Sequence, residues 1–203
     1  MMIQKEDLTG LVLLEENNNM NRLIIIEGPQ GTGKTTLANY LRENIPGSNL
    51  YRLSGQKEKE ETGKLISKKM YEALLDYLEK MVDIPMDLIF DRTFFTEEVY
   101  ARLRYKQYNF TDVYQSLLDR FLKLNYEIYF INLYLKDTSI YEKRLKREHH
   151  NYQAFSVESS IDQQNVYKEI GEKLKQNGVN VCFLCMDDFN KAYDKVNKLL
   201  NIK

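Results

Sequence analysis

The sequence has no tryptophan, only two cysteines and only three prolines among its 203 residues. So few cysteines exclude the disulfide framework of a small secreted domain and suit a reducing compartment. No apolar run approaches the roughly 18–20 residues that are needed to cross a bilayer. The first ten residues, Met1 to Gly10, also lack the basic and apolar stretches of a signal peptide. We therefore expect a cytoplasmic protein without a membrane partner.

Neither sign of charge dominates, because 29 basic and 30 acidic residues leave a net charge of −1. Nucleic-acid-binding domains usually carry a clear basic excess, so no nucleic-acid partner is predicted. The length fits one domain with a core of its own. We expect this domain to span residues 22–203. An N-terminal extension of residues 1–21, with a short apolar patch at Leu11 to Leu14, precedes it.

Short apolar runs alternate with amphipathic stretches along the rest of the chain. A continuous apolar run is typical of a strand buried on both faces of a parallel sheet. Such runs predict strands at Leu23–Glu27, Asn49–Leu53, Asp87–Phe90, Glu127–Leu135 and Asn180–Cys185. Helical spacing predicts helices at Lys34–Asn44, Leu65–Val82, Thr96–Tyr105, Thr111–Leu124, Asp137–His150, Val157–Gln176 and Asp187–Leu200. The alternation predicts an α/β fold with a parallel sheet, which binds ligands at the carboxyl ends of its strands.

The segment between the first strand and the first helix matches the eight-residue phosphate-binding pattern GxxxxGK[ST]. Its glycines let backbone N–H groups point at phosphate oxygens, and the start of the helix adds a favourable dipole. Lys34 is expected to reach the β- and γ-phosphates, and the Thr35 hydroxyl to bind Mg²⁺. The candidate ATP-binding residues are Gly28, Pro29, Gln30, Gly31, Thr32, Gly33, Lys34, Thr35 and Thr36. We therefore predict the three-layer sandwich of a P-loop NTPase.

Asp91 and Arg92 follow the third predicted strand. A carboxylate at this place holds Mg²⁺ directly or through water, so we expect Thr35 and Asp91 to share the metal. Motor ATPases usually have a glutamate at the next position to activate water. An arginine there indicates a clamp for a phosphate-bearing acceptor or for the transition state. An ion-paired strand end without a function is the alternative.

A basic run from Lys143 to Arg147 follows the fourth predicted strand. Arg144 and Arg147 are three residues apart and share a helical face. A helical lid at about residues 137–155 would bring both guanidinium groups over the transferring phosphoryl group, as catalytic residues. A solvated basic face is the alternative, because charge runs are common on surfaces.

These segments together resemble the thymidylate kinase and deoxynucleoside kinase group of P-loop kinases. The resemblance rests on Ile26-Glu27-Gly28 with Gly31 to Thr36, on Asp91-Arg92-Thr93, and on Arg144 and Arg147. The Asp-Arg pair matches thymidylate kinases better than the Glu-Arg-Ser of deoxynucleoside kinases. The run from Asp91 to Tyr100 is also similar to phage-type deoxynucleotide kinases. Pro29 and Gln30 depart from the residues usual in the two subfamilies, where an Asn and an acidic residue stand.

The resemblance implies a five-stranded parallel core, a helical lid, ATP with Mg²⁺ as the phosphoryl donor, and a homodimer. By position, Glu27 would act as a base or orient the acceptor, which is a nucleotide or a nucleoside. Among the residues after the Asp-Arg pair, Tyr100 and Arg104 join Arg92 as candidate acceptor-binding residues, since they share a face of the predicted helix. Tyr105 and Tyr108 are further aromatic candidates for that pocket.

The leading hypothesis is ATP-dependent phosphoryl transfer to a deoxynucleoside monophosphate, as in thymidylate kinases. One alternative is a deoxynucleoside kinase that phosphorylates a 5′-hydroxyl, and a second is a regulator that binds ATP without transfer. Arg92 together with a second arginine favours an acceptor that already carries a phosphate. The combination of Lys34, Thr35, Asp91 and the lid arginines argues against the regulator. The identity of the base and of the sugar stays open.

Overall fold

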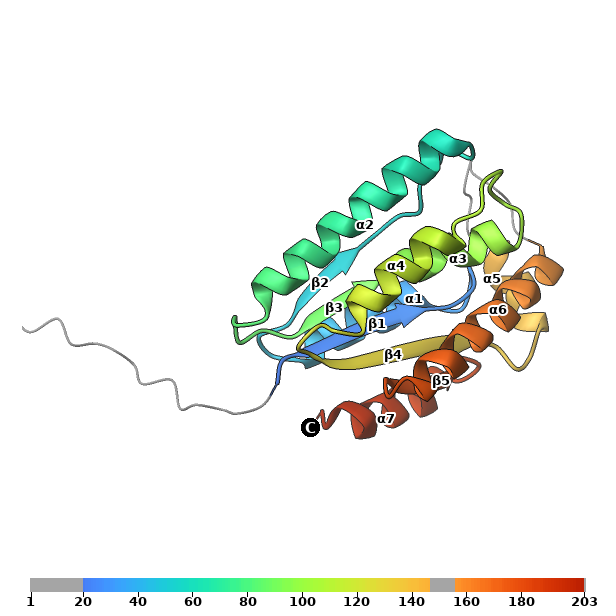
Figure 1. The fold of residues 1–203 in the computed structure, drawn as a ribbon. Coiled ribbons are helices and arrows are strands. Elements are labelled where there is room, and N and C mark those ends of the chain that lie inside the picture. The colour runs from blue at the N-terminus through green and yellow to red at the C-terminus, as the bar shows by residue number, and fades with distance from the viewer. Residues whose placement is uncertain (1–19, 147–155, 203) are drawn as a thin grey trace, which may run out of the picture.

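The computed structural model describes residues 20–146 and 156–202. Residues 1–19 of the predicted extension lie outside these ranges, as do Arg147 and residues 148–155 of the predicted lid. The described residues form a three-layer α/β domain, with one sheet between two layers of helices (Figure 1). None of the described helices is long and apolar enough to cross a membrane.

The five strands run parallel in one sheet, in the order β2-β3-β1-β4-β5. They are β1 (Arg22–Glu27), β2 (Asn49–Arg52), β3 (Leu88–Asp91), β4 (Glu127–Tyr134) and β5 (Asn180–Cys185). Each predicted strand is confirmed to within one residue at either end. β1 lies in the centre, and its side chains from Leu23 to Ile26 are fully buried. Ile26 pairs with Asp91, so the carboxyl ends of β1 and β3 lie side by side.

Seven helices in the described ranges cover the two faces of this sheet. They are α1 (Lys34–Asn44), α2 (Glu61–Met81), α3 (Phe94–Arg102), α4 (Thr111–Phe121), α5 (Ser139–Leu145), α6 (Val157–Gln176) and α7 (Phe189–Leu200). α2, α3, α4 and α6 pack over the face that holds Leu23 and Ile25. α1, α5 and α7 pack over the face that holds Ile24 and Ile26. The strand alternation thus gives two separate cores.

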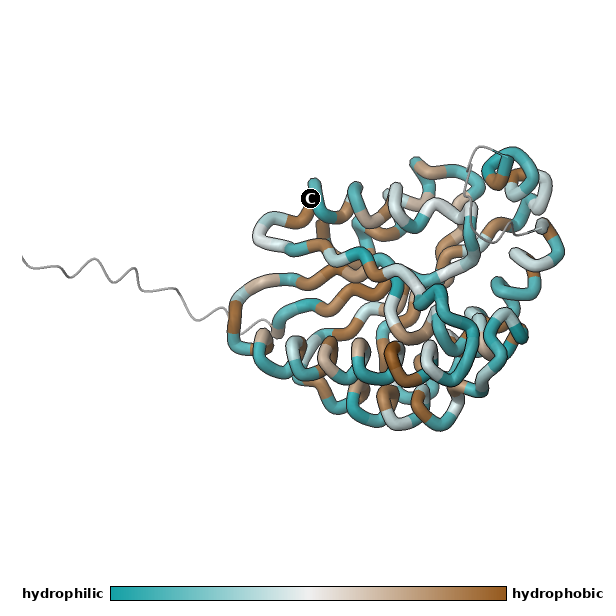
Figure 2. Tube along the Cα trace, turned by 90° about the horizontal axis from the view of Figure 1, so that it is seen from above, coloured by the Kyte–Doolittle hydropathy of each residue, from teal (hydrophilic) through white to brown (hydrophobic). Residues whose placement is uncertain are grey.

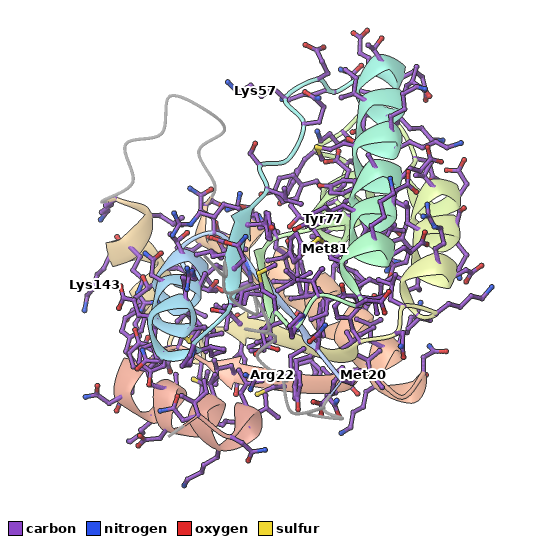
Figure 3. All side chains as sticks on the ribbon, turned by 90° about the vertical axis from the view of Figure 1, so that its left-hand side faces the viewer. Met20, Arg22, Lys57, Tyr77, Met81 and Lys143 are labelled. Carbon is purple, nitrogen blue, oxygen red and sulfur yellow. The ribbon has the colours of Figure 1, made fainter. Side chains whose placement is uncertain are left out.

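The hydrophobic residues gather along the strands and on the helix faces turned toward them (Figure 2). Tyr77 and Met81 on α2 point toward the sheet rather than outward (Figure 3). The ring of Tyr51 on β2 contacts Tyr77, and it also stacks on Phe90 of β3. These contacts pack the short edge strand β2 against its neighbour β3 and against α2.

The third helix differs from the sequence prediction. It begins at Phe94 and ends at Arg102 instead of running from Thr96 to Tyr105. Arg104 adopts the left-handed conformation with φ 58°, and the Tyr105 amide donates to the Tyr100 carbonyl over 2.9 Å. Arg104 therefore does not share a helical face with Tyr100, as the longer predicted helix required.

Candidate phosphate-binding site

The loop between β1 and α1 has the backbone that a phosphate cradle needs. Gly28, Gly31 and Gly33 all have positive φ angles, which side-chain-bearing residues rarely adopt. Gly28 also passes close to β4, because a β-carbon there would lie 2.6 Å from the Leu133 carbonyl oxygen. α1 begins directly after Gly33, so its unpaired N–H groups face the loop.

Lys34 is buried inside this loop, with an exposed fraction of 5%. Its ammonium donates to the carbonyl oxygens of Gly28 at 2.8 Å and Pro29 at 2.7 Å. The Pro29 carbonyl also accepts from the Thr32 hydroxyl over 2.8 Å. The ammonium is therefore held by the first two residues of the loop, where we expect it to contact a nucleotide phosphate.

Thr35 and Asp91 come together as the sequence predicts for a metal-binding pair. The Thr35 hydroxyl donates to Oδ2 of Asp91 over 2.8 Å. The other oxygen, Oδ1, is buried and has no hydrogen-bond partner among the described residues. Hydroxyl and carboxylate oxygens are the ligands that Mg²⁺ prefers, so the pair fits this cation. The described residues hold no group of three or more His, Cys, Asp or Glu that could bind a metal, so nucleotide and water oxygens would complete the shell.

Arg92 occupies an unusual backbone conformation directly after β3. Its φ of 75° is left-handed, which is costly for a residue with a side chain. Its amide donates to the Ile26 carbonyl over 3.1 Å and so ties the turn to β1. Burial disfavours the charge of Arg92, but the neighbouring Tyr100, Tyr167 and Asp91 outweigh it and raise the pKa of the guanidinium. The charge is therefore fixed at the carboxyl edge of the sheet.

Glu27 is fully buried beneath this turn. Its Oε1 accepts from the Thr93 amide at 2.7 Å and the Thr93 hydroxyl at 3.1 Å, and its Oε2 accepts from the Thr96 hydroxyl at 2.7 Å. Burial raises the pKa of Glu27 to about 7, while hydrogen bonds from Thr96 and Thr93 and the charge of Lys34 oppose the rise. Both oxygens thus hold the turn that carries Arg92.

Arg144 of α5 reaches the P-loop from the opposite side. Its guanidinium donates to the Gly31 carbonyl over 3.1 Å and to the Met186 carbonyl over 2.9 Å. It also lies 4.9 Å from the centre of the Phe189 ring. That ring in turn contacts Gly33, where an added β-carbon would lie 3.1 Å from it. Arg144 and Phe189 together form a flat, cationic wall beside the P-loop, which suits a nucleobase.

The candidate acceptor residues lie on the other side of the P-loop. Tyr100 is half-buried near the Arg92 charge, and its ring meets Tyr105 edge to face at 5.6 Å. Tyr108 instead belongs to the core, where its hydroxyl contacts Glu97. Arg104 is exposed beyond the end of α3. Arg92 and Tyr100 are therefore brought together, and Arg104 is not.

Several buried polar groups near this edge were missed by the sequence analysis. Glu97 and Glu98 on α3 are fully buried, and each has one oxygen without a partner among the described residues. Asn132 and Gln163 are also buried with unpaired amide atoms by the same criterion. Lys106 lies 3.1 Å from Glu97. Charged residues within a helix usually indicate a solvated face, so only Thr96-Glu97-Glu98 amid apolar residues hinted at this burial.

Comparison with known proteins adds evidence on the fold. No protein-family profile and no curated protein sequence matches the chain. Among solved structures, a thymidylate kinase from Candida albicans aligns with a TM-score of 0.68 and 15% identity, over 90% of this chain and 92% of that one. A deoxyadenosine kinase from M. mycoides with dCMP and dCDP bound aligns with a TM-score of 0.61 and 17% identity, over 88% and 98%.

A third solved structure is the YorR protein from Bacillus subtilis in complex with phosphorylated GDP. It aligns with a TM-score of 0.58 and 21% identity, over 88% of this chain and 94% of that one. The three alignments cover 88–90% of this chain and 92–98% of the other chains. The chain described here therefore has the fold of the P-loop nucleoside and nucleotide kinases.

Proposed function

We propose that this protein is a Mg²⁺-dependent kinase that transfers the γ-phosphoryl group of ATP to a deoxynucleoside monophosphate. The donor would lie along the P-loop, with its phosphates at Lys34 and Thr35 and its base against Arg144 and Phe189. Mg²⁺, held by Thr35 and Asp91, would neutralise charge on the phosphates. The acceptor would approach from the side of Arg92 and Tyr100.

The observation that carries this proposal is the fixed guanidinium of Arg92 at the carboxyl end of β3. A positive charge beside the metal-binding carboxylate suits an acceptor that brings its own phosphate. Its left-handed backbone is held by Ile26 and, through Thr93, by Glu27. Such a strained position is retained where the surrounding structure over-determines it, as at binding sites.

The hydrogen bonds of Glu27 also favour an acceptor that carries a phosphate. A hydroxyl acceptor gains from a general base within hydrogen-bond reach, whereas a phosphate oxygen is already ionised. The two oxygens of Glu27 are engaged by Thr93 and Thr96 beneath the surface, which favours a positioning role over direct contact with the acceptor. The charge of Arg92 and the hydrogen-bonded state of Glu27 therefore both favour a monophosphate as the acceptor.

A deoxynucleoside kinase is the second candidate, because the deoxyadenosine kinase from M. mycoides has the same fold over 98% of its length. Purified protein should be incubated with ATP and Mg²⁺ and with each deoxynucleoside and deoxynucleoside monophosphate in turn. Chromatography then identifies the product. We expect diphosphates from monophosphates. Monophosphates formed only from nucleosides would overturn the proposal in favour of the second candidate, and ATP binding without any transfer would favour a regulator.

A further inference from the structure

Lys106, in the connection between α3 and α4, is a buried lysine with three oxygen partners. Its exposed fraction is 6%. The ammonium lies 3.1 Å from Oε1 of Glu97 and donates to the carbonyl oxygens of Gln56 and of Glu58, the latter over 3.2 Å. An ammonium has three N–H donors, so these oxygens match its full capacity. Lysine is rarely buried unless it is paired in this way.

Two of these partners belong to the β2–α2 loop, residues 53–60. This loop leaves the carboxyl end of β2, next to the end of β3 that carries Asp91 and Arg92. A second tie lies beside the first, since the Gln107 amide donates to the Lys59 carbonyl over 2.7 Å. The α3–α4 connection therefore fastens the β2–α2 loop at the rim of the sheet where ligands bind.

The third partner, Glu97, faces the same rim. Its Oε1 is shared by Lys106 and the Tyr108 hydroxyl. Its Oε2 is buried without a partner among the described residues, and a β-carbon added at Gly55 would lie 3.8 Å from it. A buried carboxylate needs a compensating charge, and among the described contacts Lys106 is the cation that provides it.

Resting on the proposed function, we propose that Lys106 is a positioning residue for the acceptor. Its single ammonium clamps the β2–α2 loop over the acceptor side of the site and keeps Glu97 oriented beside Gly55. Lys106 does not itself touch the reacting atoms. The donor side, at Arg144 on α5 and Phe189 on α7, lies across the P-loop from this clamp.

The test is a kinetic comparison of Lys106→Met with a matched control. Methionine keeps the long apolar stem and removes the ammonium. We expect the KM for the acceptor to rise about tenfold or more, with the KM for ATP unchanged within about twofold, because a tenfold change corresponds to losing one good contact. The control, Arg120→Met, breaks ion pairs of 2.6 Å to Asp76 and 2.8 Å to Glu79, which join the last turns of α4 and α2 at the opposite end of both helices. It should leave both KM values unchanged.

A second variant tests whether a folding defect, rather than loss of the clamp, explains the kinetic effect of Lys106→Met. Glu97→Gln combined with Lys106→Met leaves no uncompensated charge, so the double variant should melt closer to the wild type than Lys106→Met does. Its acceptor KM should stay raised, because the loop carbonyls still lack their donor. A wild-type acceptor KM in either folded variant, or an equal rise in both KM values, overturns the inference.

A readout independent of activity is trypsin cleavage at the β2–α2 loop. Lys57 and Lys59 are exposed on this loop, and Lys57 points away from the body of the protein (Figure 3). Lys106→Met should speed cleavage after these lysines about tenfold relative to other sites, and Arg120→Met should not. An unchanged cleavage rate would reject the proposed clamp even if the kinase activity is confirmed. Faster cleavage in a protein that phosphorylates no monophosphate would keep the clamp and reject the proposed acceptor.

Discussion

The Thr35 hydroxyl and the Asp91 carboxylate meet at 2.8 Å although 56 residues separate them in the sequence. The contact joins the first turn of α1 to the last residue of β3. It exists because β1 and β3 are neighbours with Ile26 paired to Asp91, and because the P-loop turns the chain back over β1. The sheet register therefore sets the spacing between the two candidate metal-binding groups.

Asp91→Asn should weaken the Mg²⁺ dependence of the reaction. The amide keeps the shape and a contact with Thr35 but loses the negative charge that a divalent cation requires. We expect kcat to fall about a hundredfold and the Mg²⁺ midpoint to rise. Thr35→Ser, which retains the hydroxyl, is the control and should titrate like the wild type. An unchanged midpoint in Asp91→Asn would remove this carboxylate from the metal site.

Lys34→Met should abolish most of the phosphoryl transfer without unfolding the protein. The side chain is buried, so methionine replaces the stem while only the ammonium and its bonds to Gly28 and Pro29 are lost. We expect kcat to fall at least about a hundredfold, with the circular dichroism spectrum preserved. Lys34→Arg should fail as well, because a planar fork cannot replace a compact charge in this loop. A folded methionine variant with nearly normal kcat would contradict the P-loop assignment.

Glu27 should make stability fall with rising pH. Its pKa of about 7 in the folded protein stands against an ordinary value of 4.5. Between these values the folded state holds a proton that the unfolded chain has released, so the free energy of unfolding decreases as pH rises. The full decrease is about 3 kcal/mol at ~1.4 kcal/mol per pH unit.

Glu27→Gln isolates this effect, because the amide does not titrate. Urea unfolding of both proteins from pH 4.5 to pH 8 should show the wild type losing about 3 kcal/mol more than the variant. Parallel curves for the two proteins would mean that the carboxyl group does not change its protonation on folding. The comparison cancels the contributions of all other titrating groups.

Phe189→Ala should impair the donor and spare the acceptor. The ring supports the Arg144 guanidinium at 4.9 Å and packs on Gly33, so its loss opens the wall beside the P-loop. We expect the KM for ATP to rise about tenfold, in line with a lost cation–π and stacking contact of ~1–2 kcal/mol. Tyr193→Phe, which keeps the stack of Tyr193 on Tyr40, is the control. A rise in the acceptor KM alone would contradict the donor assignment.

The sequence predicted the strands and the P-loop well because their signals are local. A buried parallel strand reads as a continuous apolar run, and the phosphate loop has a fixed spacing of glycines. The end of α3 could not be predicted, because Leu103, Arg104 and Tyr105 contain no glycine or proline. The helix stops there while the following residue, Lys106, is buried against the β2–α2 loop, and that contact is visible only in three dimensions.

The polar groups of the acceptor side were missed for a similar reason. Glu97 and Lys106 are charged residues nine positions apart. Glu97 lies in the Asp91–Tyr100 run that resembles phage-type deoxynucleotide kinases, but nothing in that run predicts its pairing with Lys106. Their burial depends on how the α3–α4 connection packs against the β2–α2 loop, which no periodicity along the chain encodes. Arg144 was predicted as a catalytic lid residue, and its described contacts are with the Gly31 and Met186 carbonyls and the Phe189 ring. Its role in the transition state stays a prediction, as does that of Arg147, which lies outside the described residues.

The position of β1 between β3 and β4 has a consequence for the kinetic order of the proposed reaction. The candidate donor wall is built from segments that follow β4 and β5, and the candidate acceptor groups follow β2 and β3. Two substrates that enter from opposite edges do not have to pass one another, so neither has to leave before the other binds. We therefore expect a ternary complex with direct transfer, and initial-velocity lines that intersect rather than run parallel.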